Sequence, residues 1–214
     1  MSQTTFLIGL AAQFFYTARA LVQWIKSEKS KKIESPTIFW IFSLLGSSLF
    51  FFYGYLRDDF SIIFGELLSY YIYMWNLKAK GILTHIPKAI TWVFAFVPVA
   101  ILGLMLKDFS YFTSSFFKNE DLPIYAIVWG SVGQFIYKMR FVYQWYYSYR
   151  HKESLLPVTF WVLALVGSLM IIIYGFFRLD WIIIIGQTGI IATIRNIIMG
   201  RKFKKEKEVP ESYK

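Results

Sequence analysis

An internal repeat constrains this chain more than any other feature of its sequence. Residues 13–66 align with residues 134–187 without a gap, and 21 of the 54 paired positions are identical. The matches include glutamine, arginine, tryptophan, proline and aspartate, whereas chance similarity between apolar segments yields mainly leucine and isoleucine matches. The chain is therefore expected to contain two copies of one structural unit, separated by a segment that belongs to neither.

Long apolar segments indicate what each copy is made of. Of the 214 residues, 57% are hydrophobic, with a mean hydropathy of +0.47, whereas soluble domains are about 45–50% apolar. Most of the apolar runs approach the roughly 20 residues that cross a hydrocarbon core as a helix, and they lack the strict alternation of barrel strands. We expect an all-α integral membrane protein with seven transmembrane helices, over residues 5–25, 37–56, 60–78, 87–106, 123–149, 157–177 and 181–199.

The number of spans determines how the two copies are related. Each copy contains three apolar runs, so a second copy placed directly after the first would be inverted in the membrane. The fourth run shows none of the motifs of the repeat, and it crosses the membrane once more between the copies. The two copies are therefore expected to be parallel, a plan that recurs in transporters. The expected divisions are a first three-helix repeat, a linker transmembrane helix, a second three-helix repeat and a basic cytoplasmic tail, at residues 5–78, 87–106, 123–199 and 201–214.

The placement of basic residues predicts the orientation. The net charge is +10, and fifteen of the lysines and arginines lie at the ends of runs one, three, five and seven. The opposite connections hold four, namely Arg57, Lys107, Lys118 and Arg178. Because basic connections stay in the cytoplasm, the N-terminus is expected outside and the C-terminus inside. The tail is expected to lie near anionic headgroups, and nucleic acid is a poor alternative partner for so apolar a chain.

A polar stripe recurs on the first helix of each copy. At 100° per residue its members fall within an arc of about 120°. The stripes consist of Gln13, Tyr16, Arg19 and Gln23 in the first copy and of Gln134, Tyr137, Arg140 and Gln144 in the second. The glutamines are suited either to binding across helices or to a ligand. The arginines are suited either to snorkelling toward headgroups or to holding a lipid phosphate in a shared cavity, where we expect Arg140 to matter more.

The two copies differ in their remaining charges. The first carries Glu66, a candidate proton carrier or cation site whose plainer role is to accept hydrogen bonds. The second carries Gln187 at that position, and it adds two cations, Lys138 and Arg195. The second copy is therefore the more attractive to anions. Asn76 and Asn196 lie near the inner ends of their helices, where they suit either a pore or a helix cap.

The sequence offers little for catalysis. It contains no cysteine, which excludes disulfides and thiol chemistry, and its two histidines, His85 and His151, lie far apart. A metal site is improbable on this composition, and no cofactor is expected. No nucleophile–base pair or phosphate-binding loop is visible, so the chain is not expected to be an enzyme.

The motifs of the repeat resemble a known family. Each copy carries the same series of motifs: Q-x-x-Y-x-x-R-x-x-x-Q-W-x-x-S, then P-x-x-F-W, G-S, Y-x-x-x-R-x-D, and finally G-Q with R-N in the second copy. This series resembles the N-terminal domain family of lipid-A-disaccharide synthase. That family is grouped with the PQ-loop and SWEET transporter folds. The first copy departs from it at Glu66 and Trp75, and both copies lack the proline–glutamine dipeptide. The resemblance implies a SWEET-like three-one-three arrangement in a bacterial inner membrane. It also implies pore-lining roles for Asn76 and Asn196. The catalytic domain of the synthase is a separate domain, which is not expected in this chain.

Together these features favour a transporter or flippase. The expected substrate is a phosphate-bearing lipid-linked sugar, either a polyprenyl-phosphate or a lipid A-type glycolipid, used in the synthesis of cell-envelope glycans. Two alternatives remain open. One is a non-transporting membrane partner of a glycosyltransferase, and the other is a SWEET-like uniporter of a small solute.

Overall fold

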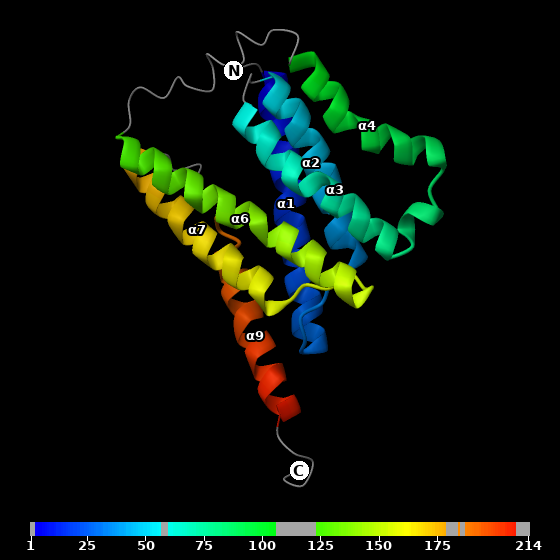
Figure 1. The fold of residues 1–214 in the computed structure, drawn as a ribbon, viewed down its shortest axis with the longest axis vertical. Coiled ribbons are helices and arrows are strands. Elements are labelled where there is room, and N and C mark those ends of the chain that lie inside the picture. Colours follow the sequence, from blue (N-terminus) through cyan, green and yellow to red (C-terminus); the bar gives the residue numbers. More distant parts are fainter. Residues whose placement is uncertain (1–2, 57–59, 106–122, 179–183, 185–186, 209–214) are drawn as a thin grey trace. The chain divides into compact units, whose positions relative to one another are not determined.

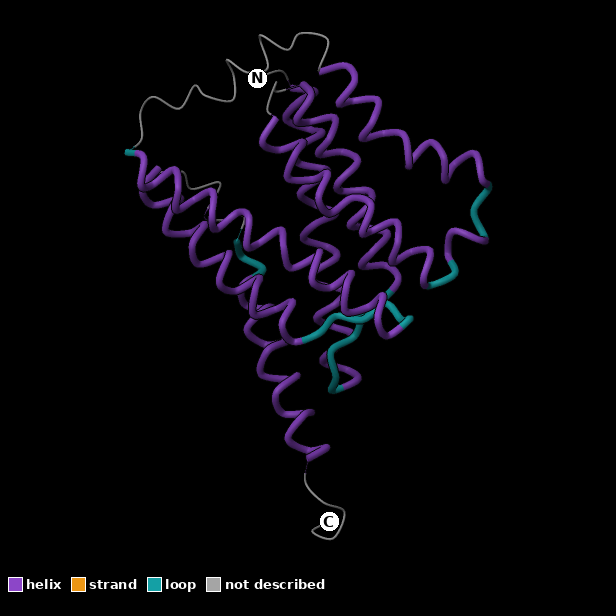
Figure 2. The backbone as a smooth tube through the Cα atoms, viewed as in Figure 1, coloured by secondary structure: helices purple, strands orange, loops and turns teal. Residues whose placement is uncertain are grey.

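The computed structural model describes residues 3–56, 60–105, 123–178, 184 and 187–208. Within these ranges the protein is helical without any strand, which confirms the all-α expectation (Figure 1). Figure 2 draws the described loops, such as residues 31–36 and 152–157, in teal between the helices. The elements are α1 (Gln3–Ser30), α2 (Thr37–Leu56), α3 (Phe60–Ala79), η1 (Ile82–Thr84), α4 (Lys88–Met105), α6 (Ile124–His151), α7 (Val158–Arg178) and α9 (Ile190–Glu208).

Three of the described helices are long and apolar enough to cross a membrane, namely α1, α2 and α7. The helix α4 contributes a shorter apolar stretch, Lys88–Leu104. Large apolar side chains such as Phe14, Trp92 and Phe135 are exposed on α1, α4 and α6, as expected for surfaces that face lipid. These helices fit association with a membrane, while the arrangement of seven spans stays a prediction.

The chain forms two compact units, which are described separately below. The first unit contains residues Met1–Arg19 and Thr37–Asp121, and the second contains Ala20–Pro36 and Leu122–Lys214. The boundary falls inside α1, so the end of this helix and the loop after it pack with the second copy of the repeat. This division differs from the simple sequence repeat, because Ala20–Pro36 belongs to the first copy by sequence.

The sequence repeat reappears as repeated local geometry. The first helix of each copy ends in a lysine with left-handed backbone, at Lys31 (φ 58°) and Lys152 (φ 55°). Upstream of the aligned segments, Gly9 packs against the ring of Tyr53, and Gly130 packs in the same way against Tyr174. These contacts extend the structural repeat four residues beyond the segment aligned by sequence.

Aromatic contacts hold the helices of each unit together. In the first unit, Trp40, Phe51 and Tyr70 are fully buried, and the rings of Phe51 and Tyr70 meet edge to face at 5.3 Å between centroids. In the second unit, Phe141 and Phe160 meet in the same geometry at 5.3 Å. Each such pair contributes about 0.5–1.5 kcal/mol beyond simple burial.

Within the first unit, α4 is held to α3 through its own backbone. Pro98 has no N–H, so the carbonyl of Phe94 loses its normal helical partner, and the proline ring strains the turn that precedes it. The hydroxyl of Tyr70 donates to that carbonyl at 2.9 Å, and the hydroxyl of Tyr71 donates to the carbonyl of Ala95 at 3.1 Å. Tyr70 of α3 therefore satisfies the carbonyl freed by the proline, and Tyr71 adds a hydrogen bond to the next carbonyl along α4.

The last helix differs from its predicted range. A run over residues 181–199 was expected; its residues 181–183 and 185–186 lie outside the described part of the chain, a turn spans 187–189, and α9 covers Ile190–Glu208. Gly189 lies in this turn, where glycine is more favourable than in a helix interior. The helix continues into the predicted tail, where the spacing of Lys204 and Glu208 favours helix.

The closest approach of helices in the second unit generates a prediction about stability. A Cβ atom at Gly167 of α7 would lie 2.7 Å from the backbone nitrogen of Tyr137 on α6, and backbone cannot yield as a flexible side chain can. We expect Gly167→Ala to separate α6 from α7 and to lower the free energy of unfolding by about 1–3 kcal/mol. Thermal unfolding in detergent, followed by circular dichroism, measures the effect.

The matched control is Gly103→Ala in α4, where an added Cβ has no neighbour within 4 Å. Because alanine favours helix over glycine, we expect this substitution to be neutral or slightly stabilising. Equal destabilisation by the two substitutions would contradict the packing argument.

Candidate functional site

In the first unit, Arg19 is buried among three helices. Its exposed fraction is 9%, and its guanidinium does not snorkel to the surface. Nη1 donates to Ser43 Oγ on α2 at 2.9 Å and to the hydroxyl of Tyr73 on α3 at 3.3 Å. The guanidinium carbon also lies 4.2 Å from the centroid of the Tyr16 ring, within the range of a cation–π contact. The arginine is thus a tether between α1, α2 and α3.

Tyr16 connects this arginine to a buried carboxylate. Its hydroxyl donates to Glu66 Oε2, and Ser47 donates to the same oxygen at 2.7 Å. The exposed fraction of Glu66 is 5%, and no other carboxylate among the described residues is buried. The close approach of the Tyr16 ring requires glycine at residue 46, because a Cβ there would lie 2.9 Å from the ring. Among its described residues, the first unit therefore buries one arginine and one carboxyl group, linked through a single tyrosine.

In the second unit, Arg140 has the same burial but different surroundings. Its exposed fraction is 6%, and its guanidinium carbon lies 3.7 Å from the centroid of the Tyr137 ring and 5.1 Å from that of Phe160. In the repeat alignment, Ala164 takes the place of Ser43, and Gln187 takes the place of Glu66. The buried charge of the second unit is therefore positive within the described residues.

The other two basic residues singled out in the second copy are not buried as Arg140 is. Lys138 is only partly buried, and Arg195 is exposed on α9. Arg195 forms an ion pair with Glu28 of α1, in which its Nη2 donates to Glu28 Oε2 at 2.9 Å. These hydrogen bonds hold the pKa of Glu28, which lies beyond the apolar run, at about 2. The positive charge of Arg195 is thus neutralised by a protein carboxylate.

Gln23 and Gln144 bind the loop that follows their own helix. Ser27 Oγ accepts hydrogen bonds from Gln23 Nε2 and from the backbone nitrogen of Glu34, both at 2.9 Å. The same contacts, at 2.8 Å and 3.0 Å, recur in the second copy between Gln144, Ser148 and Leu155. The roles of Ser27 and Ser148 were not anticipated, although the final serine of the Q-W-x-x-S motif marks both positions.

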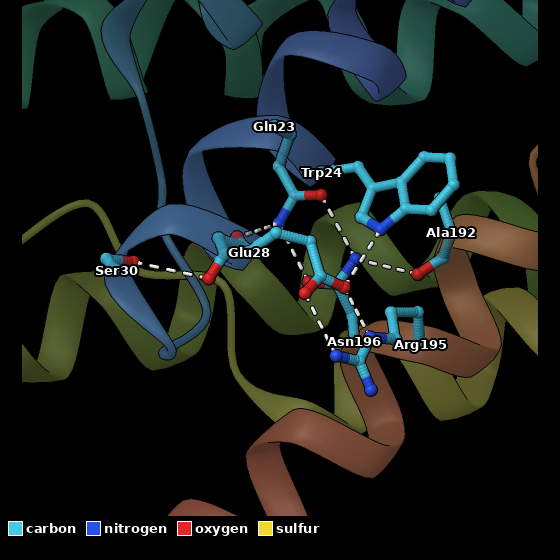
Figure 3. A network of polar contacts seen from close by, with 8 residues as sticks. Gln23, Trp24, Glu28, Ser30, Ala192, Arg195 and Asn196 are labelled. Atoms are coloured by element: carbon cyan, nitrogen blue, oxygen red, sulfur yellow. Dashed lines mark hydrogen bonds and ion pairs between the residues drawn. The ribbon is translucent and has the colours of Figure 1, made fainter.

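An amide pair holds the end of α1 against α9 (Figure 3). Gln23 Nε2 donates to Asn196 Oδ1 at 2.9 Å, and Asn196 Nδ2 donates back to Gln23 Oε1 at 3.1 Å. Both side chains are fully buried. Asn196 also donates to the carbonyl of Ala192 at 2.8 Å, as Asn76 does to that of Ile72. Asn196 therefore serves helix packing in this structure.

The buried stripe is shorter than the sequence indicated. Gln13 and Gln134 are exposed, Tyr16 and Tyr137 are partly buried, and the stripe is buried from Arg19 and Arg140 onward. The reason lies in helix geometry, because Gln13 is about 120° from Arg19 around the axis and so occupies the edge of the arc. The partly buried tyrosine and the buried arginine of each copy form the centre of the stripe.

The two contacts between α1 and α9 allow a paired test. We expect Asn196→Ala to lower the free energy of unfolding by about 1–3 kcal/mol, because it leaves the amide of Gln23 buried with a lost partner. We expect Arg195→Ala to change stability little, since water solvates the exposed ion pair. Thermal unfolding of both variants in the same detergent compares them, and a larger loss for Arg195→Ala would contradict this assignment.

Comparison with known proteins locates the repeat in a family. A family model described as the lipid A biosynthesis N-terminal domain matches residues 8–78 and again residues 129–198. Both matches begin upstream of the aligned segments, in agreement with the packing of Gly9 and Gly130. No solved structure matches the chain.

Curated relatives carry the matching region within longer proteins. Lipid-A-disaccharide synthase of Chlamydia caviae is 28% identical over 176 residues, covering 78% of this chain and 28% of that protein. The enzyme of the same name from Chlamydia felis is 25% identical over 214 residues, covering 95% of this chain and 34% of that protein. The chain thus spans about a third or less of the length of these relatives. With two matches that together cover most of its residues, the chain belongs to the family of lipid A biosynthesis N-terminal domains.

Proposed function

We propose that this protein acts in lipid A-type glycolipid synthesis, where it binds a phosphate-bearing lipid-linked sugar and moves it between leaflets. The observation that carries the proposal is the buried guanidinium of Arg140. A charge in an apolar helix bundle costs about 2.5–3.5 kcal/mol on insertion scales, so an arginine buried in such a bundle is a candidate binding site for an anion. A phosphate is the natural one, because the planar guanidinium binds two of its oxygens at once and stays charged when buried.

The family supports the lipid half of this proposal. Its description refers to lipid A biosynthesis, and the relatives are named for a lipid that carries a disaccharide. Apolar exposed surfaces on α1, α4 and α6 suit a protein that meets such a ligand from within the membrane. Transport rather than simple binding is inferred from the parallel repeat, a plan used by transporters that alternate access to one site.

A second candidate function is that of a membrane partner for a glycosyltransferase. The observation in its favour is that the relatives carry the matching region as a minor part of a chain named as a synthase. In that role the domain would hold the lipid substrate without moving it. Reconstitution without any other protein separates the two functions, because only a flippase transfers lipid by itself.

The arginines provide the main functional prediction. In vesicles that contain the purified protein and a fluorescent polyprenyl-phosphate sugar, we expect Arg140→Ala to abolish both binding and transfer. We expect Arg140→Lys to retain part of the activity, since a lysine keeps the charge but loses the bidentate geometry. Arg19→Ala should be milder, because Glu66 shares the first unit with Arg19.

The matched controls are the melting temperature and the vesicle content of each variant, which must stay close to those of the parent protein. Equal loss of transfer in Arg19→Ala and Arg140→Ala would contradict the assignment to the second unit. Full binding without any transfer by the parent protein would favour the partner role.

The proposed three-one-three arrangement of seven spans carries a separate prediction about topology. Lys29 follows the first apolar run, and Lys118 lies outside the described residues, before the fifth run. We expect single cysteines at these positions to react with an impermeant reagent from opposite sides of the membrane, with Lys29 on the cytoplasmic side. Labelling of both from one side would refute the arrangement.

A further inference from the structure

We propose that the last turns of α6 bind the sugar phosphate headgroup of a lipid-linked sugar at the surface of the second unit. The site, the α6 end patch, consists of Trp145, Tyr146, Tyr149 and Arg150. The nature of the ligand rests on the proposed function, whereas the patch is separate from the buried arginine of the same helix. Its basis is an oriented guanidinium beside exposed aromatic rings.

The members of the α6 end patch share the outer face of the helix. At 100° per residue they fall within an arc of about 140°, on the side away from the buried Gln144 and Ser148. The three rings have exposed fractions between 37% and 62%, and Arg150 is exposed as well. These side chains are therefore accessible at the surface of the second unit.

Tyr146 fixes the orientation of Arg150. The arginine Nε and Nη2 both donate to the tyrosine hydroxyl, at 3.1 Å and 3.0 Å, and the guanidinium carbon lies 5.4 Å from the centroid of the ring. These bonds occupy one edge of the planar guanidinium and leave its outer edge, formed by Nη1 and the second N–H of Nη2, for two oxygens of a phosphate. No carboxylate among the described residues forms an ion pair with Arg150, so the patch carries an uncompensated positive charge.

The aromatic rings add a surface that a sugar can use. The rings of Trp145 and Tyr149 lie side by side, with 6.0 Å between their centroids and an angle of 33° between their planes. The C–H groups of a pyranose pack on aromatic faces, while phenol and indole groups can form hydrogen bonds with its hydroxyls. A bare anion would use the arginine alone. Rings and arginine together match a sugar that carries a phosphate.

The first copy indicates that anchoring in the membrane does not account for these rings. Tryptophan and tyrosine gather at membrane interfaces, and both copies keep the tryptophan. At the constant spacing of the repeat, Ile25, Glu28 and Lys29 stand where the second copy has the two tyrosines and the arginine. In the proposed parallel arrangement the two helices end at the same level, so the membrane alone does not require tyrosines there.

The patch and the buried arginine lie on the same helix. Arg150 follows Arg140 by ten residues, which is about 15 Å along the axis of α6. Water and salt weaken an exposed pair between arginine and phosphate. We therefore expect the patch to bind in the millimolar range, above the lipid concentrations at which transfer in vesicles is measured, and the buried site to bind more tightly.

Saturation-transfer difference NMR on the full chain in detergent micelles tests the patch with glucose 1-phosphate as the probe. Glucose and inorganic phosphate, added as competitors, represent the two halves of the ligand. We expect glucose 1-phosphate to bind about fivefold or more tightly than either half, because each half makes only part of the contacts. Tyr146→Ala should lower its affinity about fivefold or more, since it removes a ring and the support of Arg150.

The matched control is Tyr125→Ala, at the other end of α6. Its ring is 64% exposed and meets Phe177, so it loses a comparable aromatic surface outside the patch. We expect this variant and Arg140→Ala to bind glucose 1-phosphate as the parent does. Tyr146→Phe keeps the ring without the hydroxyl and should retain part of the affinity. The melting temperature of each variant shows that the fold is intact.

A displacement series determines whether the headgroup belongs to a lipid. In the Arg140→Ala variant, polyprenyl phosphoglucose should displace glucose 1-phosphate from the patch, and undecaprenyl phosphate, which has no sugar, should do so about fivefold less well. If the free sugar phosphate binds but the lipid does not displace it, the lipid source is overturned.

The remaining outcomes separate this inference from the proposed function. Equal affinities in Tyr146→Ala and Tyr125→Ala, loss of the signal in folded Arg140→Ala, or equal binding of inorganic phosphate and glucose 1-phosphate would each overturn the α6 end patch. If transfer in vesicles depends on Arg140 while no sugar phosphate binds the patch, the function stands and the inference falls. If the patch binds as expected but the protein neither binds lipid through Arg140 nor transfers it, the function falls and the patch stands.

Discussion

A positive charge inside an apolar helix bundle is the constraint on which the rest of this structure depends. Arg19 and Arg140 are both buried, and each lies over the ring of a tyrosine three residues before it. That ring fits only where the facing helix carries a glycine, so Gly46 and Gly167 follow from the arginines. The small residues of the G-S motif are thus part of the charged site as well as a means of close packing.

Much of this arrangement was predictable from the sequence, because it depends on periodicity. Apolar runs predicted the helices, and the repeat placed Tyr16 and Arg19 on one face, where the cost of exposing a charge to lipid directs it inward. Pairing over long distances was not predictable. Gln23 meets a partner 173 residues away, and its spacing within α1 contains no information about Asn196. The start of α9 was also missed, since hydropathy does not reveal a turn formed around Gly189.

The polar residues of the repeat divide into two groups with different tasks. Those toward the end of each first helix, such as Gln23, Ser27 and their counterparts, are occupied by loop backbone and by neighbouring helices. Those near the middle, the tyrosine and arginine, surround a charge. Sequence alone left the glutamines and arginines open between structural roles and ligand binding, because side chains of the same type serve either purpose in lipid, and it did not anticipate the serines. The distinction required the loops, whose backbone donors are invisible in a pattern of residue types.

The attachment of α4 to α3 has a consequence for how freely α4 can change. Tyr70 and Tyr71 donate hydrogen bonds to the main-chain oxygens of Phe94 and Ala95, so these bonds do not depend on which side chains stand at residues 94 and 95. Selection on this joint therefore acts on Pro98 and the two tyrosines, and the outward residues of α4 can drift among apolar types. A helix held in this way can adapt to membranes of different lipid composition while α3, against which it packs, keeps its sequence.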